Sequence, residues 1–287
     1  MEELHQCPVC QNEKLKAYID VVDHFGSKEV FSLSSCSQCN TLITTPRPDE
    51  KNIITYYKSN SYVSHGDKVN PVFDKVYKQV QSRNLNYKQR IIEKYTLSKT
   101  LLDYGCGAGT FLSHMVRNGW SGVGVEPDSN ARQIALSKKI QVLPLHEIKD
   151  SFDCITLFHV LEHVHQLRTT LQALIEKLNK SGVLILALPN FKSYDAHYYK
   201  QHWAGYDVPR HLYHFSQKSI FTLAKSFGLN IVATHPMKFD SYYVSLLSEK
   251  YKHGKSRLLP AIKTGYISNQ RAKSSKEYSS LIYILSR

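Results

Sequence analysis

The chain has 287 residues, of which 42% are hydrophobic, and its formal net charge is +13 at pH 7. That length suits one α/β domain with a small appendage. The first residues, 1–9, contain no apolar signal-peptide core, and the longest buried-looking run, 183–188, is far too short to cross a bilayer. These features argue against a secreted or membrane-spanning protein and predict a cytoplasmic one without a transmembrane segment.

Two C-x-x-C pairs stand near the N-terminus, with strand-like alternation over 17–22 and 29–33 between them. The four residues are Cys7, Cys10, Cys36 and Cys39. Four thiolates in two such pairs close a tetrahedral site without an open position, so we predict a zinc ribbon over residues 1–48 that holds a structural zinc ion. Free cysteines on loops, or a redox-active pair, are the alternatives, although neither C-x-x-C opens a βαβ unit.

Residues 49–97 mix scattered apolar positions with many Lys, Arg and Gln residues. A short helix is expected over 49–57. Further helices are indicated by the apolar positions Val72, Val76, Val80, Ile91 and Ile92. We interpret the segment as a helical cap over a cofactor pocket, and a passive linker is equally compatible with the pattern.

An apolar strand turns into a helix at the run Asp103-Tyr104-Gly105-Cys106-Gly107. Its glycines let the backbone approach a ligand and adopt dihedral angles that a Cβ would forbid. A dinucleotide-binding turn would carry its third glycine at the position of Thr110, so the run favours a different nucleotide cofactor. The next strand ends at Glu126, where a carboxylate would accept both ribose hydroxyls.

Two further motifs follow the glycine run, namely Val125-Glu126-Pro127-Asp128 and Phe152-Asp153-Cys154-Ile155, which leads into Val160-Leu161-Glu162-His163-Val164. Through these three motifs the chain, from about residue 98 onward, resembles the class I S-adenosylmethionine-dependent methyltransferases. The alternative is a glycine-rich turn in some other α/β enzyme.

The resemblance implies an α/β fold with a doubly wound, seven-stranded, mostly parallel, Rossmann-like sheet over 98–287. Within this segment we expect a substrate insert at 190–215 and a basic insert at 237–278. The resemblance also implies that the glycine turn holds the methionine part of S-adenosylmethionine and that Glu126 holds its ribose. The expected cofactor-binding residues are Asp103, Tyr104, Gly105, Cys106, Gly107, Glu126, Pro127 and His159.

Strand and helix signals alternate through this segment, as in a doubly wound sheet. Strands are expected over 100–104, 121–126, 140–143, 152–158, 183–188, 229–235 and 280–286, and helices over 109–118, 129–138, 166–180 and 217–227. Leucines at 167, 171, 174 and 178 form a core-facing stripe, and the helix that carries them is expected to end at Gly182. Ser216 is expected to cap the helix that follows it.

Histidines are the main candidates for catalysis. Methyl transfer from a sulfonium is an in-line displacement in which alignment and water exclusion supply ~7 to 11 kcal/mol, and only some acceptors need a base. For a hydroxyl or an acidic carbon, an imidazole would be the natural base. His159 is predicted to line the cofactor pocket, and His163 is either catalytic or structural.

Residues 203–216 gather Trp, two Tyr, Asp, Arg and two His in one connection. Aromatic faces with paired charges suit a polar, ring-shaped substrate. We expect His211 to act as base or to orient the substrate. We expect substrate binding by Tyr206, Asp207, Arg210 and His214. In the alternative, His211 caps the next helix and Asp207 pairs with Arg210 structurally.

The segment 250–276 contains eight Lys or Arg residues and no Asp or Glu. Such charge suits an anionic partner such as RNA, a nucleotide-linked substrate or an anionic membrane surface, although a solvated, partly mobile loop is the expected structure.

The sequence favours a small-molecule methyltransferase that acts on oxygen or carbon of a polar or anionic acceptor, such as a sugar-linked compound or a secondary metabolite. An RNA methyltransferase that grips phosphates with the ribbon and the basic segment is the second candidate. This second candidate is disfavoured because the fourth strand lacks the Asn/Asp-Pro-Pro-aromatic signature expected for methylation of base amines. A non-enzymatic, cofactor-binding scaffold is the third.

Overall fold

The computed structural model describes residues 1–57, 71–96 and 98–287, and for residues 71–78 it describes the backbone alone. The chain divides into two compact units. Unit 1 comprises Met1–Tyr62, His159–Thr170 and Ala187–Tyr283, and unit 2 comprises Val63–Phe158, Leu171–Leu186 and Ile284–Arg287. Within the predicted helical segment 49–97, residues 58–70 and 97 and the side chains of Val72 and Val76 lie outside the described residues.

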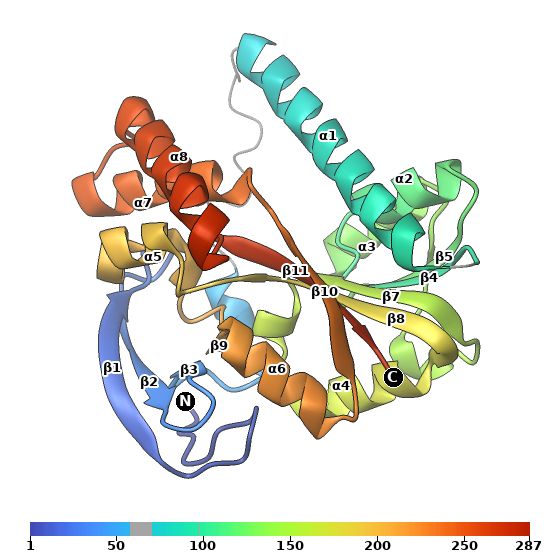
Figure 1. The fold of residues 1–287 in the computed structure, drawn as a ribbon, viewed down its shortest axis with the longest axis horizontal. Coiled ribbons are helices and arrows are strands. Elements are labelled where there is room, and N and C mark those ends of the chain that lie inside the picture. Colours follow the sequence, from blue (N-terminus) through green and yellow to red (C-terminus); the bar gives the residue numbers. More distant parts are fainter. Residues whose placement is uncertain (58–70, 97) are drawn as a thin grey trace. The chain divides into compact units, whose positions relative to one another are not determined.

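The smaller sheet, in unit 1, is antiparallel and has the strand order β1-β2-β3-β9 (Figure 1). Its strands are β1 Leu15–Val22, β2 Val30–Cys36, β3 Leu42–Thr44 and β9 Tyr213–His214. The two strands expected between the cysteine pairs are therefore present. The fourth strand, β9, comes from the predicted substrate insert. Phe31 and Leu33 of β2 pack in one buried apolar cluster with Phe191 and Trp203, so the N-terminal residues and the insert share a core.

The larger sheet has the order β10-β11-β8-β7-β4-β5-β6. Its strands are β4 Thr100–Tyr104, β5 Ser121–Val125, β6 Gln141–Val142, β7 Phe152–Phe158, β8 Leu178–Pro189, β10 Asn230–Pro236 and β11 Ser280–Ser286. Strand β4 lies parallel to both β5 and β7, and β5 lies parallel to β6. Nearly continuous burial of β7, β8 and β11 is typical of strands covered on both faces. The predicted α/β fold with a seven-stranded, mostly parallel sheet is confirmed.

The α-helices are α1 Pro71–Tyr95, α2 Thr110–Arg117, α3 Ser129–Ser137, α4 Leu167–Glu176, α5 Tyr194–Tyr199, α6 Gln217–Ser226, α7 Asp240–His253 and α8 Leu258–Ser275. Short 3-10 helices occupy η1 Ile53–Tyr56, η2 Leu145–Glu147, η3 Leu161–His163, η4 Lys200–His202 and η5 Ala204–Tyr206. Ser216 caps α6 in a capping box with Ser219, as predicted. No helix in the described part of the chain is long and apolar enough to cross a membrane.

The end of α4 differs from the prediction. The helix stops at Glu176 and β8 begins at Leu178, so Gly182 lies inside a strand and does not end a helix. A Cβ at Gly182 would lie 2.9 Å from Leu178 Cδ1 and 3.0 Å from the carbonyl oxygen of Phe152. The glycine is therefore explained by close packing within the sheet. The leucine stripe itself is buried, as expected.

The basic segment 250–276 also differs from the prediction, because most of it lies in α7 and α8, which pack side by side (Figure 1). The two helices approach closely at Gly265, where a Cβ would lie 2.8 Å from Tyr242 Cδ1. Asn269 Nδ2 donates to the carbonyl oxygen of Lys238 at 2.9 Å, and Ser241 Oγ donates to that of Gly265 at 3.1 Å. The expected mobile loop is thus an ordered helical hairpin.

Candidate functional site

The glycine turn follows β4 in unit 2. The amides of Gly105 and Cys106 donate to the carbonyl oxygen of Val125, at 2.8 and 3.1 Å, which ties the turn to the end of β5. Gly107 and Gly109 have φ angles of 54° and 69°, in the left-handed region that favours glycine. An added Cβ at Gly107 would meet no atom within 4 Å. The turn therefore presents bare backbone to open space, which suits close approach of a ligand.

Glu126 holds the turn through its carboxylate. Oε2 accepts a hydrogen bond from the Gly107 amide at 2.8 Å, and Oε1 accepts one from the Asp128 amide at 2.9 Å. An ionised carboxylate has about four acceptor positions, so two remain for a ligand. The residues present thus fit a cofactor that offers hydroxyl donors, such as a ribose.

Asp103, the other predicted carboxylate, is 4% exposed on β4. Its Oδ1 accepts a hydrogen bond from Thr156 Oγ1 at 2.7 Å. Burial raises the pKa of Asp103 to about 6, and the negative charge of Glu126 adds to this, while the Thr156 hydrogen bond and the charge of Lys88 oppose it. At neutral pH the site therefore holds a buried negative charge that a cationic ligand would stabilise.

The pKa of Asp103 predicts a pH-dependent effect of Asp103→Asn on stability. A carboxyl whose pKa is raised by folding adds stability below its unfolded pKa near 3.8, and this stability is lost as pH rises through 6. We expect urea unfolding to show that Asp103→Asn is about 2 to 3 kcal/mol more stable than wild type at pH 8 and nearly equal to it at pH 4. The exposed Asp150→Asn is the control, and an equal difference at both pH values would contradict this account.

Two aromatic rings and a lysine lie in the same unit and were not predicted as site residues. Phe158, at the end of β7, meets Phe111 of α2 edge-on with ring centroids 4.9 Å apart. Lys88 of α1 places its Nζ 4.0 Å from the centroid of the Phe158 ring. Nothing in the local pattern around Lys88 signals this position, because it depends on how α1 packs.

The other predicted cofactor residues of unit 2 lie around the turn. Cys106 is buried, and burial together with the charges of Asp103 and Glu126 raises the pKa of its thiol to about 12, so it stays protonated. Tyr104 is partly exposed, and Pro127 is exposed. The predicted residues of this unit are therefore close in space, since a turn of five residues and the end of the adjacent strand supply them all.

Unit 1 contains a compact group of histidines and carboxylates after β7. His159 directly follows that strand and has a φ of 57°, which is uncommon for a residue with a Cβ and often marks a functional position. Its Nε2 lies 3.3 Å from Asp240 Oδ2, and its Nδ1 lies 3.6 Å from Glu162 Oε1. Burial disfavours the charged imidazole, but Asp240 and Glu162 outweigh it and raise the pKa of His159 to about 9. His159 is thus cationic at neutral pH.

The two predicted catalytic histidines belong to the same group. The rings of His163 and His211 meet edge-on with centroids 4.6 Å apart. His163 Nδ1 lies 3.0 Å from both the Tyr57 hydroxyl and the carbonyl oxygen of Arg210. Burial and the charge of His211 lower the pKa of His163 to about 4, so this ring is neutral at physiological pH. The structure therefore brings His159, His163 and His211 together, along with Glu162 and Asp240, which had been given no site role.

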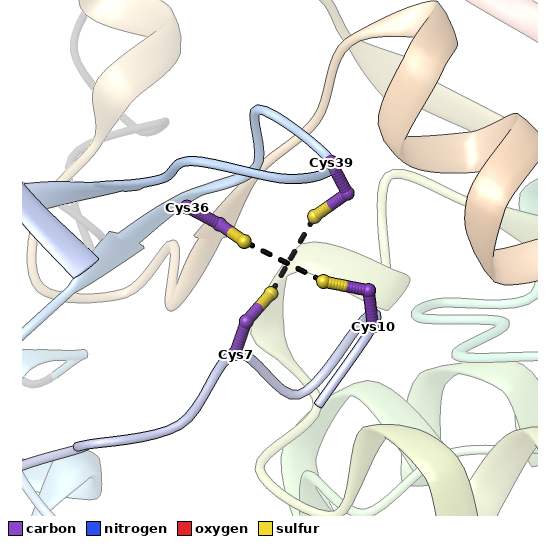
Figure 2. Close-up of side chains that lie close together, drawn as sticks. All are labelled: Cys7, Cys10, Cys36 and Cys39. Atoms are coloured by element: carbon purple, nitrogen blue, oxygen red, sulfur yellow. Dashed lines mark hydrogen bonds between the residues drawn. The ribbon is translucent and has the colours of Figure 1, made fainter. Parts of the chain in front are cut away.

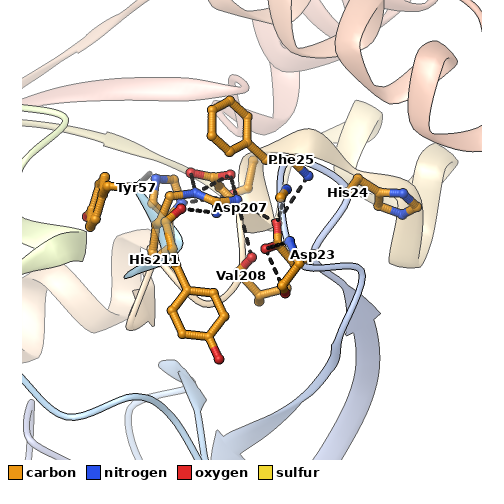
Figure 3. Close-up of polar contacts among 12 residues, drawn as sticks. Asp23, His24, Phe25, Tyr57, Asp207, Val208 and His211 are labelled. Carbon is orange, nitrogen blue, oxygen red and sulfur yellow. Dashed lines mark hydrogen bonds and ion pairs between the residues drawn. The ribbon is translucent and has the colours of Figure 1, made fainter. Parts of the chain in front are cut away.

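Asp207 and Arg210 form an ion-pair network with Asp23. Figure 3 labels Asp23 and Asp207 of this network. Arg210 Nη2 lies 2.7 Å from Asp207 Oδ1 and 2.9 Å from Asp23 Oδ1, and Nη1 donates to the carbonyl oxygen of Tyr56 at 3.0 Å. Arg210 is 4% exposed, and each of its side-chain nitrogens contacts a protein oxygen. Asp207 is the more accessible partner. The network links the N-terminal residues to the insert, so Asp23 is a contributor that the sequence pattern did not reveal.

The remaining predicted substrate residues are buried. Tyr206 is 3% exposed and belongs to the apolar cluster of unit 1, and the ring of His214 meets it edge-on at 5.3 Å. His214 Nε2 lies 3.2 Å from Thr44 Oγ1 of β3. Burial, with a contribution from the charge of His211, holds the pKa of His214 well below its usual range.

The four N-terminal cysteines converge, as Figure 2 shows. All four sulfur atoms lie within 4.8 Å of one another, with Cys7 Sγ 3.5 Å from Cys39 Sγ and Cys10 Sγ 3.4 Å from Cys36 Sγ. A disulfide would need about 2.05 Å, and all four cysteines are free. Tetrahedral zinc with bonds of about 2.3 Å would place its sulfur ligands roughly 3.8 Å apart, so this cluster has the dimensions and donor atoms of a thiolate metal site.

The comparison with known families decides the class of the chain. The model of a family described as a methyltransferase domain matches residues 77–234, more than half of the chain. This chain belongs to that methyltransferase family. The matched residues include the glycine turn, Glu126 and the histidines described above.

Curated relatives of this methyltransferase match over shorter stretches. A mitochondrial ubiquinone biosynthesis O-methyltransferase of Schizosaccharomyces pombe is 32% identical over 103 residues, 31% of this chain and 37% of the relative. The Homo sapiens protein of the same name is 32% identical over 112 residues, 34% of this chain and 30% of the relative. The match thus spans about a third of the length of each of these two relatives. An uncharacterized methyltransferase of Alkaliphilus oremlandii is 30% identical over 139 residues, 43% of this chain and 63% of that protein.

Two solved structures show the same fold. A mycolic acid cyclopropane synthase in complex with SAH and CTAB superposes with a TM-score of 0.51 and 13% identity, over 73% of this chain and 85% of that one. Coclaurine N-methyltransferase bound to N-methylheliamine and SAH superposes with a TM-score of 0.50 and 11% identity, over 73% of this chain and 71% of that one. Both confirm the architecture of the methyltransferase domain.

Proposed function

We propose that the protein transfers a methyl group from S-adenosylmethionine to an oxygen or carbon acceptor on a small molecule. The observation that carries this proposal is the pairing of the open turn at Gly107 with the Glu126 carboxylate, in a chain of the methyltransferase family. When bound, S-adenosylmethionine supplies an electrophilic methyl group on a sulfonium. The buried charge of Asp103 suits a cationic ligand of this kind.

Within unit 1, we propose that the histidine group serves the acceptor. His211 is the candidate base or orienting group, because His159 keeps its proton and the low pKa of His163 makes that ring a weak base. Asp207 is the candidate for contact with a polar substrate. The contacts of Arg210 with Asp23 and Asp207 support a positioning role for its guanidinium.

The histidine proposal is tested with labelled S-adenosylmethionine and a panel of hydroxylated aromatic compounds, sugar nucleotides and RNA. On the accepted substrate we expect His211→Ala to lower turnover about 100-fold or more, the usual effect of removing a general base. The exposed His146→Ala should match wild type. If His211→Ala keeps most of the turnover, His211 is not the base. If RNA alone is methylated, with binding that weakens steeply as salt rises, the acceptor is RNA and not a small molecule.

We further propose that Cys7, Cys10, Cys36 and Cys39 hold one structural zinc ion. Four thiolates leave no coordination position for substrate, so the ion would stabilise the fold and take no part in the transfer. Zinc thiolates also require reduced cysteines, which supports a cytoplasmic location.

A further inference from the structure

Glu162, His163 and His211 form a second group of potential metal ligands in the described part of the chain. One ligand atom from each lies within 4.8 Å of the other two. The first two residues belong to η3, and His211 comes from the connection before β9, so unit 1 brings together parts of the chain far apart in sequence. This group is separate from the four-cysteine cluster.

The carboxylate of Glu162 has unused binding capacity. It is 1% exposed, and neither of its oxygens hydrogen-bonds to any residue that the structure describes. Two imidazole nitrogens lie near it, His159 Nδ1 at 3.6 Å and His211 Nε2 at 4.0 Å from Oε1, both beyond ordinary hydrogen-bond distance. A buried carboxylate is normally satisfied by hydrogen bonds, by an ion pair or by a metal ion, and the ion pair of Oε1 with His159 leaves Oε2 without a hydrogen-bond partner among the described residues. Ligands of one ion with bonds near 2.1 Å stand about 3.0 to 3.5 Å apart, whereas His211 Nε2 stands 4.0 Å from Glu162 Oε1 and the group as a whole spans up to 4.8 Å, so the side chains would move inward around an ion.

Both histidines are oriented as metal ligands usually are. His163 Nδ1 lies 3.0 Å from the carbonyl oxygen of Arg210, and His211 Nδ1 lies 2.9 Å from that of Gly205. A carbonyl oxygen only accepts, so each Nδ1 carries the proton and donates, which leaves the lone pair on Nε2. A metal-bound histidine commonly donates its other ring nitrogen to a backbone carbonyl in this way.

We propose that Glu162, His163 and His211 bind one divalent transition-metal ion. Two imidazoles and one carboxylate suit manganese, iron or zinc better than calcium, and three protein ligands leave positions open for a further ligand. His159 lies at the edge of this site with Asp240 on its other side.

The consequence for the reaction rests on the proposed methyl transfer from S-adenosylmethionine, and it replaces the role of His211 as base with that of a metal ligand. An ion at this site would bind a hydroxyl of the acceptor and lower its pKa, which favours methylation on oxygen over carbon. The hydroxyl proton passes to solvent, the oxygen forms a bond to the methyl carbon, and the carbon–sulfur bond breaks with its electron pair going to sulfur. The products are a methyl ether and a neutral thioether, so no oxidant or reductant is needed.

The test uses the full chain loaded with one equivalent of zinc, which fills the four-thiolate site first, and Mn²⁺ as the probe, because manganese prefers oxygen and nitrogen ligands to thiolates. Titration followed by electron paramagnetic resonance should show one bound Mn²⁺ per chain. Glu162→Gln should weaken this binding at least tenfold, and the exposed Glu147→Gln should match wild type. His211→Asn, which keeps a donor near the Nδ1 position and removes Nε2, should weaken binding similarly, with His146→Asn as its control.

Titration of S-adenosylhomocysteine into the same variants separates this proposal from the proposed function, because the residues of the glycine turn are unchanged. Glu162→Gln should bind it as wild type does, which also shows that the variant is folded. The metal site is overturned if zinc-loaded wild type binds no Mn²⁺ at millimolar concentration, or if both variants bind it as tightly as wild type. In that case His159 is simply the counter-ion of Glu162. Loss of S-adenosylhomocysteine binding in wild type would overturn the proposed function and leave the metal proposal standing.

Discussion

Glu126→Ala is expected to bind S-adenosylhomocysteine at least tenfold more weakly than wild type in calorimetric titration. The carboxylate is expected to bind the ribose, and it also holds the amides of Gly107 and Asp128. Hydrogen bonds to charged groups contribute ~1.5 to 3 kcal/mol each, and tenfold in affinity corresponds to about 1.4 kcal/mol. Losing a single such bond to the ligand is enough for the expected change, and relaxation of the turn adds to it.

Glu147→Ala is the matched control for this variant. Glu147 is an exposed carboxylate of the same unit and lies in η2, after β6 and outside the glycine turn. It should bind the ligand as wild type does. An affinity of Glu126→Ala within twofold of wild type would contradict the assignment of the ribose to Glu126.

Removal of the proposed zinc ion is expected to unfold the N-terminal residues, from 1 to about 45. Structural zinc typically contributes ~10 to 16 kcal/mol in small modules. Because β9 pairs with β3 and Ser219 Oγ donates to the carbonyl oxygen of Cys39, the loss of order should extend to residues 213–219. Hydrogen exchange before and after chelation measures this directly.

Substitution of one ligand gives the same test without a chelator. Cys10→Ser should lower the bound zinc and abolish exchange protection in β2, whereas Cys106→Ser, which alters a buried cysteine outside the cluster, should keep one zinc per chain. Unchanged protection of the N-terminal strands after complete removal of zinc would show that the ion is not structural.

The elements of the larger sheet could be predicted because their signals are local. Strand β4, the glycine turn and Glu126 are close in sequence, and a buried parallel strand is recognisable from its apolar run. The prediction failed where packing overrode the local pattern. Leu178 continues the leucine periodicity of α4, yet it begins β8, because a core leucine satisfies either a helix or a strand.

The helices α7 and α8 could not be predicted from apolar periodicity. The buried face of α8 consists of Ala261, Thr264, Gly265, Ser268, Asn269 and Ala272, which are small or polar. Exposed apolar residues such as Leu259 and Ile262 lie on its other face. Close helix packing through small residues therefore reversed the usual relation between hydrophobicity and burial.

The candidate site could be predicted only in part, because residue types are visible in the sequence and contacts between distant residues are not. The sequence identified His163 and His211 as candidates for catalysis, and Asp207 and Arg210 as candidates for substrate binding. It could not reveal that Asp23 reaches Arg210, since that contact joins residues 187 positions apart in the sequence. The partnership of Glu162 with His211 likewise depends on the fold, although the Leu161-Glu162-His163 motif had marked the position.

Calorimetric titration of S-adenosylhomocysteine into zinc-loaded wild-type protein, with NAD⁺ titrated in parallel, tests directly whether this methyltransferase uses S-adenosylmethionine. We expect saturable binding of S-adenosylhomocysteine at one site per chain and no binding of NAD⁺. A flat titration with S-adenosylhomocysteine would contradict this expectation.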